Sequence, residues 1–239
     1  MNLYCRLPFG QCNSRNKLVN EVAGQMDRTA GSISRKLGNI PSLDPRHQAR
    51  GVGGLPNSSK LDRKVWSEFQ SNWSIMANKS EAAFETLMAG TVTEKTVPEI
   101  EKPSGPSEAE RMIKTRRLQT FFRNVVLSSY ENCCALPGIT VPSLLIASHI
   151  IPWSEDEKRR ADPTNGLCLN ALHDKAFDCH LITFDEDYRL VVSGILKKSD
   201  IPEFQEANFA KLEGAKLTLP HRFAPDHRAL EEHRNAFVA

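Results

Sequence analysis

Residues 144–183 constrain the fold of this chain more than any other part of the sequence. An apolar run ends in Ser148-His149, and Ile150-Ile151-Pro152 follows it, which predicts a strand that stops at the proline. A charged loop comes next, and Asn165-Gly166 then leads into a second apolar run. A short helix with His173 near its start completes the segment, so two strands followed by a helix are predicted.

Three polar residues stand at the ends of these predicted elements. Asn165 comes sixteen residues after His149, and His173 comes eight residues after Asn165. Each is a weak signal alone, because a histidine at a strand end is usually a surface residue and Asn-Gly is usually a turn. In this order, and within these apolar runs, they resemble the site of HNH nucleases, which implies hydrolysis of phosphodiesters with one divalent cation.

Each of the three residues has an expected role in that chemistry. His149 titrates near neutral pH and is suited to be the general base that activates water. Asn165 can join the two strands through backbone hydrogen bonds and thereby orient His149. His173, at the start of the helix, can bind the cation through one ring nitrogen, and the cation would act as a Lewis acid beside the leaving oxygen.

The composition is that of an ordinary globular protein. The 239 residues are 40% hydrophobic and 25% charged, which allows one large or two modest domains. No apolar run approaches the roughly 20 residues that span a bilayer, and the first ten residues lack the features of a signal peptide. A cytoplasmic location is therefore expected. The six cysteines include no C-x-x-C pair, so no zinc ribbon is predicted and the thiols are expected to be reduced.

Charge and proline content divide the chain into parts. Residues 1–90 hold 12 Lys or Arg against 7 Asp or Glu, whereas residues 109–239 hold 17 against 18. Residues 91–107 contain three prolines and few large apolar residues, which indicates a linker. We therefore expect a helical domain before the linker and a second domain over residues 108–239. The positive excess of the first part could attract phosphates or be an ordinary solvated surface.

Two short helices joined by a tight polar turn are predicted near the start of the chain. Asn13-Ser14 can cap the first, which ends near Met26, and the second spans residues 30–40. Such a pair suits a helix-turn-helix that reads DNA, although any small helical domain can contain one. The residues expected to contact DNA are Arg28, Ser32, Arg35 and Lys36 in this pair, with Arg116 and Arg117 on a later long helix that could instead stay solvated.

Four further elements are expected in the second half. Ser107 can cap the long helix, which runs to about Tyr130. Residues 133–142 are expected to form a first strand with a Pro-Gly turn. A hairpin is predicted on either side of Asp185-Glu186-Asp187, and residues 227–239 read as a terminal helix.

The segment from about Leu118 to the C-terminus resembles an HNH endonuclease of the subgroup written AHIxPW…NGLxLxxxxHxxFDxGLIT. The N-terminal stretch, from RLPFGQCNSRN through SKLDRKVWSEF, resembles an α-helical domain that accompanies such nucleases in bacterial restriction-type proteins. The two resemblances together cover most of the chain. The residues that match the nuclease motif are Ala147, His149, Ile150, Pro152, Trp153, Asn165, Gly166, Leu167, Leu169, His173, Phe177, Asp178, Leu181 and Ile182.

This resemblance implies an α+β fold in two domains. The first is an N-terminal all-α, helix-turn-helix-like domain over residues 1–90, and the second is a C-terminal ββα-metal HNH nuclease domain over residues 108–239. It implies a metal-dependent endonuclease acting on double-stranded DNA, of restriction type and open to control by base modification. Because one HNH site naturally cuts one strand, a homodimer is expected if both strands are cut.

The sequence departs from the family pattern at two places. Ser148 stands where many such sites have Asp or His as a metal ligand, and a hydroxyl is a poor lone ligand for a hard cation. Asp178 and Asp174 are the candidates for that ligand, together with Ser148 acting through a water, although Asp178 could equally cap or brace the helix. Cys179-His180 replaces the usual Arg-Gly, which places an extra imidazole near the site. Mg²⁺ or Mn²⁺ is favoured as the cation, with Ni²⁺ or Zn²⁺ as alternatives.

Three other functions stay open. One is a nicking or homing-type nuclease of mobile DNA. Another is a DNA-binding regulator with a degenerate, metal-free HNH fold, which Ser148 favours. The third is a toxin nuclease that cuts DNA with little sequence preference.

Overall fold

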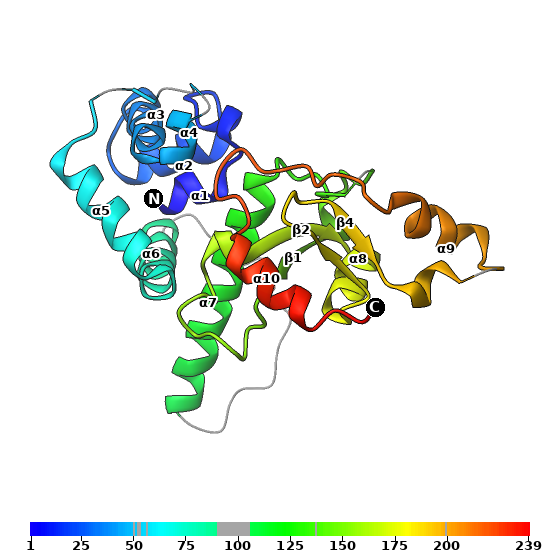
Figure 1. Cartoon of the computed structure of the whole chain (residues 1–239). Helices are drawn as coiled ribbons and strands as arrows, with labels where there is room; N and C mark the ends of the chain where they lie inside the picture. Colours follow the sequence, from blue (N-terminus) through cyan, green and yellow to red (C-terminus); the bar gives the residue numbers. More distant parts are fainter. Residues whose placement is uncertain (50, 52–53, 56, 90–105, 137, 199) are drawn as a thin grey trace.

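The structure, a computed structural model, describes residues 1–49, 51, 54–55, 57–89, 106–136, 138–198 and 200–239. The long helix α7 (Pro106–Ser129) lies between the N-terminal helices and two small antiparallel sheets (Figure 1). The predicted linker, residues 91–107, lies outside the described residues except for its last two positions, which begin α7. No helix in these described ranges is long and apolar enough to cross a membrane.

The described residues before position 90 form helices and turns, consistent with the expected all-α region. Local capping explains where several of these helices begin. The Thr29 side chain accepts a hydrogen bond from the backbone N–H of Ser32, and Ser59 and Asp62 form a reciprocal capping box. The elements are α1 (Asn2–Arg6), η1 (Phe9–Gln11), α2 (Lys17–Gln25), α3 (Ala30–Asn39), η2 (Ile40–Leu43), α4 (Pro45–Ala49), α5 (Lys60–Ser71) and α6 (Trp73–Met88).

Helices α2 and α3 form the expected pair of short helices. They pack through buried apolar residues, including Val22 on α2 and Leu37 on α3. In the turn between them Asp27 adopts a left-handed conformation, with φ 51°. The predicted Asn13-Ser14 cap is wrong: Asn16 caps α2, because its side chain accepts from the first backbone N–H groups of the helix.

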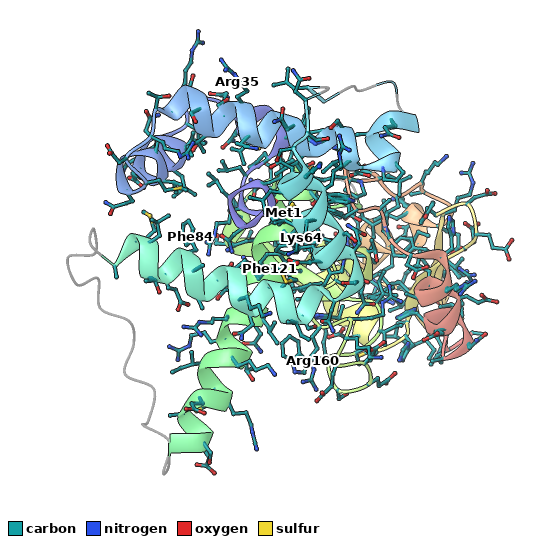
Figure 2. The ribbon with its side chains drawn as sticks, turned by 90° about the vertical axis from the view of Figure 1, so that its left-hand side faces the viewer. Met1, Arg35, Lys64, Phe84, Phe121 and Arg160 are labelled. Atoms are coloured by element: carbon teal, nitrogen blue, oxygen red, sulfur yellow. The ribbon has the colours of Figure 1, made fainter. Side chains whose placement is uncertain are left out.

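Aromatic side chains join the N-terminal helices to α7. Phe121 of α7 stacks on Phe69 of α5 with ring centroids 6.0 Å apart, and Trp73 of α6 lies 6.2 Å away. Figure 2 shows Phe121 in the interior of the molecule beside α6 and α7. All three rings are buried.

Arg222, from the C-terminal part of the chain, connects the N-terminal helices to α7. Its side chain is 1% exposed. The guanidinium donates hydrogen bonds to the carbonyl oxygens of Tyr4 and Leu7, and to the hydroxyl of Ser128 on α7. A buried charge needs such partners because burial without them is costly. The N-terminal helices and the C-terminal part therefore share one core.

Two strands and a helix follow one another, as predicted from residues 144–183. Strand β1 (Leu145–His149) pairs antiparallel with β2 (Gly166–Asn170), so that His149 lies opposite Gly166. The turn η4 (Pro163–Asn165) leads into β2, and α8 (Ala171–Asp178) follows it. Helices α7 and α8 both pack against these strands.

Two expectations about the approach to this hairpin are wrong. The described residues of 133–142 form no strand. The backbone N–H of Ala135 donates to the carbonyl of Cys168 in β2, and the backbone N–H of Asn170 donates to Cys134 Sγ. The turn η3 (Pro142–Leu144) then leads into β1. Ser107 does not cap α7, because the helix already includes Pro106.

The predicted second hairpin is confirmed. It consists of β3 (Ile182–Phe184) and β4 (Leu190–Val192), which pair antiparallel. The predicted terminal helix is also present as α10, although it ends four residues earlier than expected. The remaining elements are η5 (Gly194–Lys197), α9 (Glu203–Asn208), η6 (Ala210–Leu212) and α10 (His227–Asn235).

Position 166 requires glycine because a side chain would not fit there, and not because of its backbone conformation. Its φ and ψ of −129° and 141° are extended and open to any residue. A Cβ at this position would lie 2.5 Å from Val126 Cγ2 and 2.9 Å from Phe122 Cζ, both on α7. Gly166→Ala is therefore expected to destabilise the fold by about 1–3 kcal/mol, as overpacking usually does, measured by urea unfolding. Gly24 of α2 has open space, so Gly24→Ala should leave stability equal or higher; equal effects of both variants would contradict this explanation.

Candidate active site

His149 lies at the end of β1, on the wall of an open groove of about 310 Å³. Its imidazole stacks on the Phe122 ring of α7, with ring centroids 3.7 Å apart and an interplanar angle of 13°. The Trp153 ring meets it edge-on at 5.7 Å and 87°. These two contacts fix the plane of the imidazole.

A backbone carbonyl fixes the tautomer of His149. Nε2 lies 3.0 Å from the carbonyl oxygen of Arg160, which can only accept a hydrogen bond. Nε2 therefore carries the proton, and Nδ1 of the neutral ring keeps its lone pair. Nδ1 has no hydrogen-bond partner among the described residues and is not buried. The nitrogen that can take up a proton is thus the one that solvent can reach.

Burial lowers the pKa of His149 from its ordinary value near 6.5. The hydrogen bond to the Arg160 carbonyl and the negative charge of Asp178 both raise this pKa, but burial dominates. The ring is consequently neutral at neutral pH, which is the form that a general base needs.

Asn165 holds the chain that follows His149. Its side chain is 1% exposed. Oδ1 accepts a hydrogen bond from the backbone N–H of Ile151 at 2.8 Å, and Nδ2 donates to the Ile151 carbonyl at 3.0 Å. Its own carbonyl accepts from the N–H of Ile150 at 3.0 Å. These hydrogen bonds join the segment that follows β1 to the turn that leads into β2.

The loop between β1 and η4 presents the Arg160 carbonyl to His149. Arg160 Nε donates to the carbonyl of Trp153 at 2.8 Å, and the guanidinium lies 5.1 Å from the centre of the Trp153 ring. An ion pair with Glu157, at 3.2 Å, also engages Arg160. The neighbouring Arg159 forms ion pairs with two aspartates. The loop is therefore held by its own side chains as well as by the strands.

Two carboxylates lie one turn apart on α8. Burial raises the pKa of Asp174, the charge of Asp178 raises it further, and the Ser148 hydroxyl lowers it. Ser148 is buried on β1, and its Oγ makes no well-formed hydrogen bond to any described residue, although it lies close enough to Asp174 to affect that pKa. Ser148 and Asp178 are thus both close enough to Asp174 to affect its pKa, and the charge of Asp178 also acts on the pKa of His149.

His173 is enclosed in the fold and is 1% exposed. Asn170 caps α8: its Oδ1 accepts from the N–H groups of Leu172 and His173, which turns its Nδ2 toward His173 Nδ1 at 2.9 Å. Nε2 of His173 lies 3.0 Å from the Asn208 carbonyl, to which it must donate. Both ring nitrogens are engaged, so this geometry does not support the expected role of His173 as a metal ligand. It joins the start of α8 to the end of α9.

Oxygen atoms are the groups of this site that could bind a divalent cation. Across the described ranges there is no group of three or more His, Cys, Asp or Glu side chains that could hold a metal ion. The two carboxylates of α8 and the Ser148 hydroxyl suit Mg²⁺ or Mn²⁺, because Mg²⁺ commonly binds one or two carboxylates and keeps several waters. Ni²⁺ and Zn²⁺ prefer nitrogen or sulfur donors and fit this set less well.

The residues expected to contact DNA in the N-terminal region differ in their surroundings. Arg28 and Arg35 are exposed, and Ser32 is half-buried. Lys36 forms an ion pair with Asp62 at 2.9 Å and so braces α5. Figure 2 shows Arg35 on the opposite side of the N-terminal helices from Arg160, so the exposed face of α3 and the loop beside His149 are well separated.

The two expected DNA contacts on α7 also differ. Arg116 is exposed, whereas Arg117 forms an ion pair with Glu85 of α6 at 2.7 Å. The extra imidazole, His180, lies against the His233 ring at 4.6 Å and lines a separate cavity of about 100 Å³.

Three groups that contact His149 or His173 were not predicted from the sequence. Asn170 carries an available signal, because an asparagine just before a helix commonly caps it. The Arg160 carbonyl carries none, because every residue has a backbone carbonyl. Phe122 carries none either, because nothing in the sequence pairs an aromatic residue of the long helix with His149.

A model of the HNH endonuclease family matches residues 134–185. The matched region contains β1, β2, α8 and β3, and therefore His149, Asn165 and both carboxylates. It supports an HNH domain in this part of the chain and, at the level of the family, a nuclease. No curated protein matches the chain.

Proposed function

We propose that this chain is a divalent-cation-dependent DNA endonuclease in which His149 is the general base. The observation that carries the proposal is the hydrogen bond from His149 Nε2 to the Arg160 carbonyl, because it leaves Nδ1 unprotonated and open to solvent. The family match at residues 134–185 supports the reaction class.

In the proposed mechanism a water in the groove loses a proton to His149 Nδ1 as its oxygen attacks phosphorus. The bond from phosphorus to the 3′ oxygen then breaks, and the leaving oxygen keeps the bonding electron pair and takes up a proton from solvent. The Arg160 carbonyl stabilises the positive imidazolium that forms, because a hydrogen bond from a charged donor is stronger than a neutral one. Phe122 and Trp153 hold the ring plane, and Asn165 holds the chain after His149. A cation held by Asp174 and Asp178 would stabilise charge on the phosphate and the leaving oxygen.

Double-stranded DNA is the proposed substrate and a restriction-type role the proposed setting. The exposed cations Arg28, Arg35 and Arg116 support contact with phosphates. Cleavage of both strands would then require a homodimer, since the part of the chain that the structure describes holds one such site.

The test is cleavage of supercoiled plasmid prepared from modifying and non-modifying hosts, with Mg²⁺, Mn²⁺ or EDTA. We expect cleavage with either cation and none with EDTA. Discrete linear bands that depend on the host would support a restriction-type dimer, whereas nicked circles alone would favour a nicking enzyme.

The alternative function is a DNA-binding regulator that does not cleave. Ser148 at an expected ligand position and the occupied ring of His173 favour it. Retention of DNA in a gel-shift assay without cleavage under any cation would replace the nuclease proposal with this one.

A further inference from the structure

The N-terminal helices contact the loop beside His149 through Ser74. Ser74 is the second residue of α6 and is 9% exposed. Its Oγ lies 2.8 Å from the carbonyl oxygen of Glu157 and 3.0 Å from that of Lys158. Both acceptors are backbone oxygens, so the hydroxyl is the donor.

This contact lies close in the chain to the carbonyl that orients His149. Glu157 and Lys158 precede Arg160 by three and two residues. The Glu157 side chain also pairs with the Arg160 guanidinium, so a movement of Glu157 would act on Arg160 through both backbone and side chain. A continuous path therefore runs from α6 through this loop to His149 Nε2.

We propose that Ser74 is a positioning residue for the reaction: it holds the loop so that the Arg160 carbonyl keeps His149 in the tautomer with a free Nδ1. This inference rests on the proposed role of His149. Its consequence is that the N-terminal helices contribute to the rate of cleavage as well as to DNA binding.

The kinetic test compares Ser74→Ala, Ser74→Thr and Ser71→Ala in the full chain. Loss of the hydroxyl should lower kcat about tenfold with KM within about twofold, because small misplacements of a catalytic group are costly to the rate. Threonine keeps the hydroxyl and should restore most of kcat. Ser71 is the matched control, since its hydroxyl donates to the Glu68 carbonyl of its own helix and to no other residue that the structure describes. Lower thermal stability of Ser74→Ala with an unchanged kcat would overturn the proposal.

A second measurement does not depend on activity. ¹⁵N NMR of the histidine rings, with the His149 signal assigned through His149→Gln, reports which ring nitrogen carries the proton. We expect the Nε2–H form in the wild-type chain and in Ser74→Thr, and a mixture of tautomers in Ser74→Ala. A pure Nε2–H form in Ser74→Ala overturns the proposal whatever the rate. If the wild-type chain cleaves no DNA, the proposed function fails, and this measurement still decides whether Ser74 orients His149.

Discussion

His149→Ala is expected to reduce cation-dependent cleavage of plasmid DNA by about a thousandfold, within the range of 10²- to 10⁴-fold that a general base contributes. The variant removes His149 Nδ1, a ring nitrogen that is unprotonated, that solvent can reach and that has no partner among the described residues. The water then has no base to accept its proton. Initial rates of nicking, measured at saturating Mg²⁺ or Mn²⁺, give the effect directly.

The variant also removes a ring that stacks on Phe122, so loss of packing must be separated from loss of the base. His149→Gln retains a polar side chain of similar length and should be as inactive as alanine. Thermal unfolding and DNA retention should stay close to wild type for this variant. His221 is a half-exposed histidine outside the groove, and His221→Ala should cleave normally. A His149→Ala rate within tenfold of wild type would remove His149 from the mechanism.

Local signals explain why the hairpin and α8 were predictable. The apolar runs, the proline after Ile151 and the Asn165-Gly166 pair each act over a few residues, and the structure has the two strands and the helix that they predict. The predicted strand at 133–142 is wrong because a strand needs a partner along its length, whereas the backbone N–H of Ala135 makes a single hydrogen bond to the Cys168 carbonyl of β2. The Arg222 contacts with Tyr4 and Leu7 were not predictable, because they join residues more than 200 positions apart.

The spacing of residues on α8 separates His173 from the two carboxylates. The family pattern selects a histidine, but a helix turns about 100° per residue, so Asp174 and Asp178 share one face and His173 lies on the neighbouring one. The face of His173 meets Asn170 and the Asn208 carbonyl. Asn208 belongs to α9, which the sequence did not predict, so the second partner of the ring could not be foreseen. The i, i+4 spacing of the carboxylates was visible in the sequence.

Asp174→Asn and Asp178→Asn are each expected to lower cleavage by about a hundredfold or more and to weaken the binding of Mn²⁺. Asparagine has nearly the shape of aspartate but lacks its charge, and a hard cation prefers carboxylate oxygens. Calorimetric titration with Mn²⁺ measures binding without DNA, and cleavage rates at increasing Mn²⁺ should show partial rescue. Lys175→Ala, on an exposed position between the two aspartates, is the control for changes on this helix.

His173→Gln tests whether the cation is held by the two carboxylates or by the histidine that the family motif selects. The variant removes a ring whose two nitrogens form hydrogen bonds with Asn170 and with the Asn208 carbonyl. It should therefore lower the free energy of unfolding by about 1–3 kcal/mol, which is the usual cost of leaving buried polar groups unpaired. At temperatures where the variant is folded, its affinity for Mn²⁺ should stay near that of wild type. If instead His173→Gln keeps its stability and loses Mn²⁺, while both asparagine variants bind it normally, then the imidazole rather than the carboxylates holds the cation.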